Sequence, residues 1–543
     1  MSTVTSAQAQ TDDRAGPRQW IALAVLALPS LLLSLDLSVL FLALPHLSAD
    51  LGASSSELLW IGDIYGFMVA GFLITMGALG DRIGRRKLLL LGAASFAVAS
   101  VVAAYATSPE MLIASRALMG IAGATIQPCT LGLISNMFRN AKQRTVAISL
   151  WMTCFMVGLA LGPFVGGVML QFFWWGSVFL LAVPVMVLLL ATAPVLLPEF
   201  RDSQPGRVDL LSVALSLGTI LPVIYGLKQV VTDGLTWPTV LSVVVGLAIG
   251  VVFVRRQRAL ADPLFDLRLL GNRAVSGALG TLLFAGVAVS GILLFFTQYL
   301  QLVKGLPPFR TGLLIIPYTI GVIAGSLLSP GLAQRIRPGT VVAGGLAIGT
   351  LGFLLVSQVQ NLPGLTLTEI GLVIACGGVA PVYVLGTDLV VGSAPPERAG
   401  SAASLAMTGG EVGTALGIAV LGSVGTAVYR NEIADTMPAD VPSSAAQSAN
   451  DTLASAVEVA AGLPGALGAD LLEAARDAFT DAFVAVAVVN AVMVALLAIV
   501  VAAVLRHIPP TGSNAKATTP TEPTAEEARN GQPATVAGEA SGD

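Results

Sequence analysis

The chain has 543 residues, of which 55% are hydrophobic and 11% are charged, and its mean hydropathy is +0.83. Because a soluble domain carries roughly 25% charged residues, no water-soluble core could hide this much apolar surface, and lipid is the expected solvent. The formal net charge of -4 gives no sign of a nucleic-acid partner. With only 3 cysteines and 2 histidines, the sequence gives no sign of a disulfide framework, a metal site or a cofactor.

Fourteen apolar stretches are each about as long as the roughly 20 residues that a helix needs to cross a bilayer. They cover residues 20–44, 57–79, 88–106, 111–136, 146–169, 174–197, 209–228, 237–255, 274–302, 310–333, 340–358, 366–392, 404–429 and 479–505. The sequence therefore predicts an all-α membrane protein with fourteen transmembrane helices.

Lysine and arginine residues outside these stretches gather on one side of the predicted membrane, together with both termini. Because cytoplasmic loops carry the excess of positive charge, we expect a multi-pass protein of the cell (inner) membrane with both termini in the cytoplasm.

Two stretches do not have the character of membrane segments. Residues 430–478 are long and acidic and are expected outside the cell. Asp470, Glu473 and Asp477 have the spacing of one face of a short amphipathic helix over residues 470–479, which is either a solvated cap or a lid over the outer mouth. Residues 509–543, rich in Thr, Pro, Gly, Ala and Glu, are expected to form a disordered cytoplasmic tail.

Four motifs occur in or between the first five stretches. GALGDRIGRRK, residues 77–87, is a glycine-rich turn with one acid and four bases, which belongs in water or in the headgroup layer. LDLSV surrounds Asp36, RALMG begins at Arg116, and GLALGPFVGG covers residues 158–167.

Together these motifs resemble the major facilitator superfamily. They are similar to its signature loop between helices 2 and 3, its helix-4 arginine motif, its helix-5 antiporter motif, and the acidic helix-1 motif of the fourteen-helix drug:proton antiporters. WIGDIY, residues 60–65, fits the same branch. The likeness covers nearly all of residues 18–508 and is greatest to quaternary-ammonium and multidrug exporters.

The resemblance implies two six-helix bundles around a central cavity, formed by helices 1–6 (residues 20–197) and helices 9–14 (residues 274–508, with the external loop 430–478). Helices 7 and 8 would be an inserted pair within residues 198–273, between the two bundles. Residues 1–19 would form an N-terminal segment, and residues 509–543 would form the tail. Substrate is expected near the bilayer midplane, where the bundles meet.

The function that the resemblance implies is proton-coupled antiport, which would export lipophilic cationic drugs such as quaternary ammonium compounds, dyes and antibiotics by alternating access. The transporter is expected to be a monomer that needs no cofactor. A narrow-substrate exporter of a natural product, lipid or metabolite stays open as the alternative. Some relatives carry a helix-10 acid linked to divalent drugs, but residues 312–333 contain none, which favours monovalent cations.

The conformational motifs have a structural and a functional interpretation. Asp81 is either part of a solvated turn or a latch that pairs with a base or helix end of the other bundle in one conformation only. Gly158, Gly162 and Gly166 share one helix face, where a neighbouring helix can approach closely, and Pro163 is expected to bend the helix. The residues assigned to these motifs are Gly77, Asp81, Arg82, Gly84, Arg85, Arg86, Gly158, Gly162, Pro163, Gly166 and Gly167.

Ionisable residues inside membrane helices are costly and usually functional. At about 1.5 Å per residue, Asp36, Asp63 and Arg116 fall in one layer of the outer half, so Arg116 is expected to pair with one of the acids. We expect Asp36 to be the proton-coupling carboxylate, with Arg116 as its partner. Asp63 is expected to be a second proton site or a cargo contact, with an interfacial acid at the start of the helix as the alternative interpretation. Asp388 is either functional or a capping acid.

Glu411 is expected to recognise cations, because Gly409, Gly410, Gly413 and Gly417 around it would leave room for a bulky group. Cationic amphipathic compounds also favour aromatic and methionine surfaces. Trp60, Tyr65 and Met407 are therefore candidate substrate contacts, with helix packing or lipid contact as the alternative interpretation.

Overall fold

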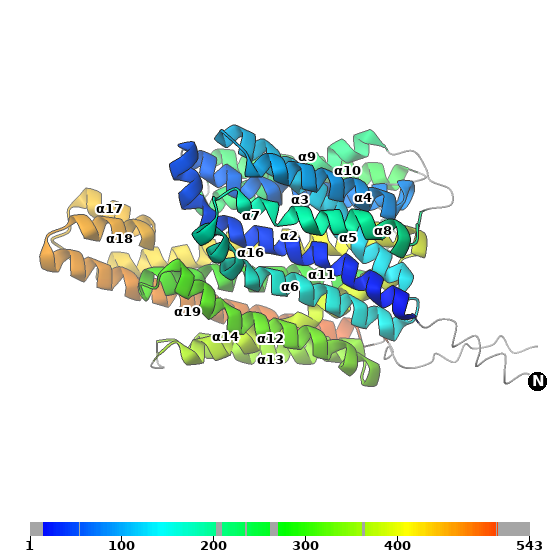
Figure 1. Cartoon of the computed structure of the whole chain (residues 1–543). Helices are drawn as coiled ribbons and strands as arrows, with labels where there is room; N and C mark the ends of the chain where they lie inside the picture. Colours follow the sequence, from blue (N-terminus) through cyan, green and yellow to red (C-terminus); the bar gives the residue numbers. More distant parts are fainter. Residues whose placement is uncertain are drawn as a thin grey trace, which may run out of the picture.

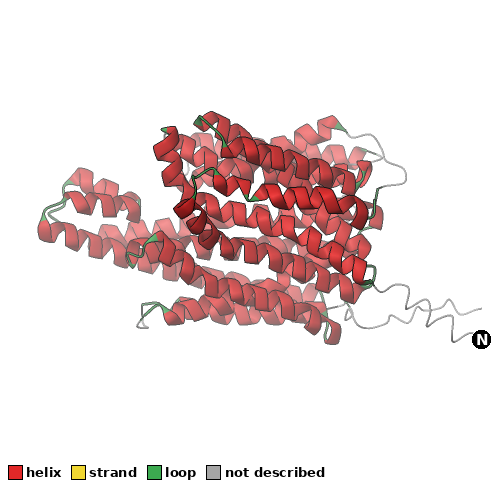
Figure 2. Ribbon diagram, viewed as in Figure 1, coloured by secondary structure: helices red, strands yellow, loops and turns green. Residues whose placement is uncertain are grey.

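The computed structural model describes residues 15–53, 55–201, 209–233, 236–260, 270–360, 364–506 and 508. Every regular element in this part of the chain is a helix (Figure 2). Of these helical segments, 14 are long and apolar enough to cross a membrane, and they coincide with the predicted spans. The all-α prediction with fourteen spans is confirmed, whereas the tail predicted at 509–543 lies outside the described residues.

The first bundle has six long helices around one hydrophobic core. They are α2 (Pro17–Leu51), α3 (Ser55–Ile83), α4 (Arg85–Ala104), α5 (Pro109–Met137), α6 (Ala141–Phe172) and α8 (Ala182–Leu196), with the short α7 (Ser177–Leu180) leading into α8. The side chains of Ser108 and Asn140 accept hydrogen bonds from backbone N–H groups in the first turns of α5 and α6, and so fix where these helices begin.

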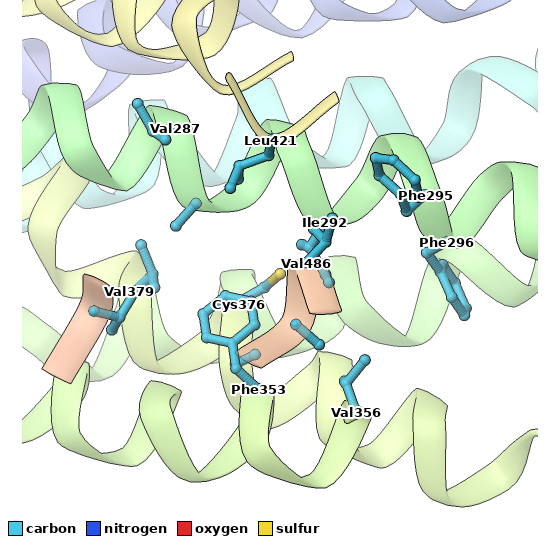
Figure 3. Packing of buried hydrophobic residues seen from close by; sticks show 14 of the residues in the cluster. Val287, Ile292, Phe295, Phe296, Phe353, Val356, Cys376, Val379, Leu421 and Val486 are labelled. Carbon is cyan, nitrogen blue, oxygen red and sulfur yellow. The ribbon is translucent and has the colours of Figure 1, made fainter. Parts of the chain in front are cut away.

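The second bundle repeats this plan around a second core. Its elements are α11 (Arg273–Gln298) with the π-helix η2 (Tyr299–Val303), α12 (Pro308–Arg335), α13 (Pro338–Val356), α14 (Thr366–Pro381) with the π-helix η3 (Val382–Gly386) and α15 (Thr387–Gly392), the 3-10 turn η4 (Pro396–Arg398), α16 (Ala399–Thr436) and α19 (Gly465–Val504). Figure 3 shows part of its core, in which Ile292, Phe353, Cys376 and Val486 come from four different helices.

We call the end of the molecule where α2 begins and α19 ends the terminal face, and the opposite end the distal face; the terminal face is at the right of Figure 1. The two bundles have matching neighbours. In the first, α2 packs along α6 and α3 along α5, and in the second, α11 packs along α16 and α12 along α14. The bundles meet where α3 packs against α16 and α6 against α12.

The inserted pair, α9 (Leu210–Asp233) and α10 (Trp237–Ala259), packs side by side, and α9 also lies on α3 and α16. Phe67 and Ala70 of α3 form a small apolar cluster with Ile220 of α9. At the terminal face, Arg256 donates hydrogen bonds of 2.7 and 3.1 Å to Asp209. These bonds, with one from Ser212, hold the pKa of the Asp209 carboxyl well below its usual range.

A helical extension projects beyond the other helices at the distal face, at the left of Figure 1. It consists of the ends of α16 and α19 with α17 (Ser443–Asp451) and α18 (Leu453–Gly462). The Tyr429 hydroxyl donates a 2.8 Å hydrogen bond to the Ala449 carbonyl and ties α16 to α17. The prediction of a separate short helix over residues 470–479 is wrong, because these residues belong to the continuous α19.

Candidate functional site

A buried ion pair joins α2 to α5. The Arg116 Nη1 atom lies 2.6 Å from the Asp36 Oδ2 atom, and the two side chains are 0% and 6% exposed. The expected pairing of Arg116 with an acid is confirmed. Arg116 also lies over the Tyr65 ring, 4.7 Å from its centroid, and its Nε donates a 3.4 Å hydrogen bond to the Ile61 carbonyl of α3. Its buried Nη2 atom has no hydrogen-bond partner in the described part of the chain.

Glycine residues let the helices around this ion pair approach one another. A Cβ on Gly158 of α6 would lie 2.0 Å from the Leu31 carbonyl oxygen of α2, and one on Gly162 would lie 1.7 Å from the Ser38 Oγ. Gly120 of α5 would meet the Tyr65 carbonyl oxygen at 2.6 Å in the same way. No side chain fits at these positions, so α6 packs closely on α2 and α5 packs closely on α3 beside Asp36 and Arg116.

The rest of the helix-5 motif has a different setting. Gly166 is buried, whereas a Cβ on Gly167 would meet nothing within 4 Å. The helix α6 continues unbroken through Pro163 as far as Phe172. The close approach that the sequence predicts for this face is thus found at Gly158 and Gly162.

Two further acids lie on helix faces that point across the boundary between the bundles. Asp63 is half-buried on α3, and it shares a face with Gly77 and Asp81, which contact α16. Glu411 is exposed although it lies well inside α16, and it shares a face with Ser404, which contacts α3. Gly77 and Ser404 are in contact and so lie at the same level. At 1.5 Å per residue along α3 and α16 from that level, Asp63 lies about 10 Å nearer the distal face than Glu411.

The surroundings of Glu411 correct one expectation. Gly413 and Gly417 do not leave room for a bulky group, because a Cβ on either would collide with α11, at 2.1 Å from the Leu283 carbonyl oxygen and 2.2 Å from the Ser290 Oγ. Only the side toward Gly410 is open, where a Cβ would meet nothing within 4 Å. Glycine content alone could not distinguish a packed helix contact from open space.

The candidate aromatic and methionine contacts are dispersed. Tyr65 is buried under Arg116. Met407, one turn before Glu411, packs partly against the first bundle. Trp60 is 40% exposed and stacks on Tyr225 of α9 at 6.4 Å, so it contacts the inserted pair.

The glycine-rich turn after α3 contacts the other bundle directly. The Asp81 carboxylate accepts hydrogen bonds from the backbone N–H groups of Gly400 and Ser401, at 3.0 and 2.8 Å, and from the Ser401 hydroxyl at 2.8 Å. It therefore caps the start of α16, where a helix dipole favours a negative charge. This is the helix-end contact that the latch hypothesis requires.

Neighbouring residues of the turn support this contact. Arg85 is 1% exposed, lies 2.7 Å from Asp81, and donates to the Pro396 carbonyl of the second bundle at 2.8 Å. A Cβ on Gly77 would lie 2.5 Å from the Ser404 Oγ, so the approach of α3 to α16 requires glycine there. Gly84 has a φ of 111°, which other residues rarely adopt.

Two further bases of the motif differ in their environment. Arg86 faces away from the second bundle and donates to the Leu197 carbonyl at 2.9 Å. Arg82 is half-buried in the last turn of α3.

A second contact between the bundles was missed by the sequence analysis. Asp388 of α15 accepts hydrogen bonds of 2.7 Å from both Arg144 and Thr145 at the start of α6. The Asp388 side chain is 10% exposed. Nearby, the Ser149 hydroxyl donates a 2.6 Å hydrogen bond to the Ser326 carbonyl of α12. The sequence indicated that Asp388 is either functional or a capping acid, but its partners were not predictable, because Arg144 and Thr145 are not its sequence neighbours.

The contacts of Asp81, Arg85, Asp388 and Ser149 all lie toward the terminal face, and they hold the two bundles together there. Farther from that face, Cβ atoms on Gly62 and Gly66 of α3 would meet nothing within 4 Å, as on Gly410 of α16. The bundles are thus joined at the terminal face, and open space adjoins the helix positions next to Asp63 and Glu411. No cluster of metal-ligating side chains occurs among the residues that the structure describes.

Comparisons with known proteins agree with this arrangement. Residues 26–418 match the family model described as Major Facilitator Superfamily. The chain is 40% identical to the multidrug efflux pump LfrA of Mycolicibacterium smegmatis, over 86% of this chain and 92% of that protein. It is 33% identical to the methyl viologen resistance protein SmvA of Salmonella typhimurium, over 85% and 93%.

The fold is also similar to the crystal structure of the human organic anion transporter MFSD10. The TM-score is 0.58 with 17% sequence identity, and the match covers 88% of this chain and 100% of that one. At this identity the likeness establishes the fold alone.

Proposed function

The chain belongs to the major facilitator superfamily and is a multi-pass membrane transporter rather than an enzyme, and from this premise we propose that it is a proton-coupled antiporter that exports lipophilic cations. The observation that carries the proposal is the buried Asp36–Arg116 ion pair, whose Arg116 has one nitrogen without a hydrogen-bond partner in the described chain. A buried charge that loses its partner is unstable by about 3–5 kcal/mol, so a change of protonation there forces a rearrangement.

Asp36 is the group that takes up and releases the proton in this proposal. When Asp36 is protonated, Arg116 loses its counter-charge and turns toward another acceptor. Its Nη2 atom has no hydrogen-bond partner in the described chain. The Tyr65 ring and the Ile61 carbonyl beside it belong to α3, the helix that carries both Asp63 and Asp81. Protonation of one carboxylate would in this way act on the helix that forms the latch with α16.

The terminal face is the cytoplasmic side in this proposal, because it carries the positively charged turn of residues 82–87. The structure would then be an outward-open state, with Asp81 and Asp388 holding the cytoplasmic ends of the bundles together. Opening toward the cytoplasm requires both contacts to break, and proton movement through Asp36 would bias that equilibrium.

Glu411 and Asp63 are the proposed recognition groups for cationic cargo. They face the open region from opposite bundles, so a cation bound there would be attracted by carboxylates on both sides. LfrA is named as a multidrug efflux pump and SmvA for methyl viologen resistance. Methyl viologen is an organic dication, so divalent cargo enters the proposal beside the monovalent cations that the missing helix-10 acid favours.

The test is ethidium efflux from loaded cells. We expect wild type to lower cell ethidium fluorescence quickly, and both a protonophore and the Asp36→Asn substitution to abolish the effect. Asp50→Asn, an exposed acid on the same helix, serves as the matched control and should be active. Well-expressed wild type that never moves ethidium or methyl viologen would reject lipophilic cations as cargo. It would instead favour a narrow-substrate exporter.

A further inference from the structure

A polar pocket opens at the terminal face of the first bundle, away from the central boundary between the bundles. It has a volume of about 530 Å³, within the range of roughly 300–1,000 Å³ typical of small-molecule sites. Its walls come from the starts of α2 and α4 and from the ends of α5 and α8. The pocket is lined by Ala15, Arg18, Gln19, Arg86, Asn136, Met137, Arg139 and residues 194–198 and 200.

Three arginines give this pocket a positive charge, and two of them are held in place by backbone carbonyls. Arg86 donates hydrogen bonds of 2.9 and 3.3 Å to the Leu197 and Pro194 carbonyls, at the end of α8, and Arg18 donates to the Val195 carbonyl. Each guanidinium has five N–H donors, more than these bonds use. Arg139, just beyond α5, is exposed at the rim.

The acid beside the pocket does not balance this charge. The Glu199 carboxylate lies 3.7 Å from the Arg86 Nε and also accepts a 3.0 Å hydrogen bond from the Arg86 backbone N–H. Among the described residues its ion pair and its hydrogen bond are both with Arg86, so it does not pair with Arg18 or Arg139 there. Arginine favours carboxylate and phosphate groups because its planar fork donates to two oxygens together.

The position of the pocket argues for a lipid rather than a free anion. Its walls are the ends of membrane-spanning helices and the residues that adjoin them, which is the level of the phospholipid headgroups. Large apolar side chains are exposed on the adjoining helices, including Val195 and Val187 of α8 and Leu91 and Val98 of α4. Because α4 and α8 pack together, these side chains form a surface for acyl chains next to the charged pocket.

We propose that this pocket, which we call the arginine pocket, binds the phosphate group of an anionic phospholipid, with the acyl chains lying along α4 and α8. Arg18 and Arg139 supply the charge, and the carbonyl-anchored Arg86 orients the phosphate. The site is separate from Asp36, Asp63 and Glu411, so its occupation does not depend on the cargo or on proton coupling.

The test is native mass spectrometry of the purified full-length protein after exchange into equal amounts of phosphatidylglycerol and phosphatidylcholine. We expect wild type to retain phosphatidylglycerol preferentially. Because each basic residue near an anionic surface contributes about a fivefold change in affinity, the double substitution Arg18→Gln with Arg139→Gln should weaken retention by about 25-fold. Lys142→Gln with Arg335→Gln, which removes two exposed bases from the same face outside the pocket, should retain lipid as wild type does.

Further measurements identify the source of the anion and guard against misfolding. The delipidated protein is titrated with sodium phosphate at constant ionic strength, and binding of phosphate without retention of phosphatidylglycerol would overturn the lipid assignment. If the double variant does not fold, the single exposed change Arg139→Glu replaces it, with an expected loss of at least fivefold. Equal retention of phosphatidylglycerol by wild type and the folded pocket variants would overturn the site itself.

Discussion

Replacing Asp81 with asparagine should shift the molecule toward opening at the terminal face. Asp81 accepts three hydrogen bonds from the first turn of α16 and is the counter-charge of the buried Arg85. Hydrogen bonds to a charged group contribute about 1.5–3 kcal/mol each, and asparagine keeps one acceptor oxygen but loses the charge. The closed state should therefore lose about 2–3 kcal/mol, which lowers the ratio of closed to open molecules by roughly 30- to 150-fold.

Distances between spin labels at the terminal face measure this ratio. Labels at Lys142→Cys, on α6, and Arg335→Cys, on α12, report on the two bundles after the native cysteines are replaced by alanine. Glu397→Gln is the matched control, since it removes a negative charge beside the latch while the Glu397 backbone carbonyl, which accepts from Arg85, remains. A closed-to-open ratio in Asp81→Asn within twofold of wild type would refute the latch.

Three further predictions follow from the geometry. Gly162→Val should lower the thermal unfolding temperature of the purified protein and destabilise it by about 1–3 kcal/mol, because a Cβ would lie 1.7 Å from the Ser38 Oγ. Gly167→Val is the control, because a Cβ there would meet nothing within 4 Å. Equal losses of stability in the two variants would contradict the close approach of α6 to α2. Asp388→Asn should increase thiol labelling of a cysteine at Ser326, which is buried where α12 meets α6, since the substitution breaks the inter-bundle pair with Arg144. The charge swap Arg144→Asp with Asp388→Arg should restore protection, and normal protection in Asp388→Asn would show that the pair is not a latch. Glu411→Gln should weaken ethidium binding about tenfold or more while leaving the Asp36–Arg116 pair intact, and unchanged ethidium affinity by fluorescence titration would remove Glu411 from the cargo site.

Several elements follow from the sequence for clear physical reasons. The fourteen spans were predictable because each is a long apolar run, and the run 366–392 was predicted with the bounds that the structure shows for α14, η3 and α15 together. The Asp36–Arg116 pair was also predictable, since rise per residue placed both in one layer and an unpaired buried charge is too costly.

Other features depend on contacts that a single chain pattern does not specify. Arg144 and Asp388 are 244 positions apart, and neither has a neighbour that indicates the other. Gly413 and Gly417 suggested space beside Glu411, but the facing helix α11 fills it. The polar, acidic character of residues 430–478 suggested a loop, yet Ala-rich segments there form α17 and α18 and extend α19. Which face of a helix meets which partner is decided by the tertiary packing.

Proton movement coupled to cargo is the central claim, and it is tested most directly with the purified protein in liposomes that contain a pH-sensitive dye. An ethidium gradient imposed across the membrane should drive protons in the opposite direction in wild type, and Asp36→Asn should bind ethidium but move no protons. Ethidium transport without proton movement in wild type, or undiminished proton movement in Asp36→Asn, would contradict the account.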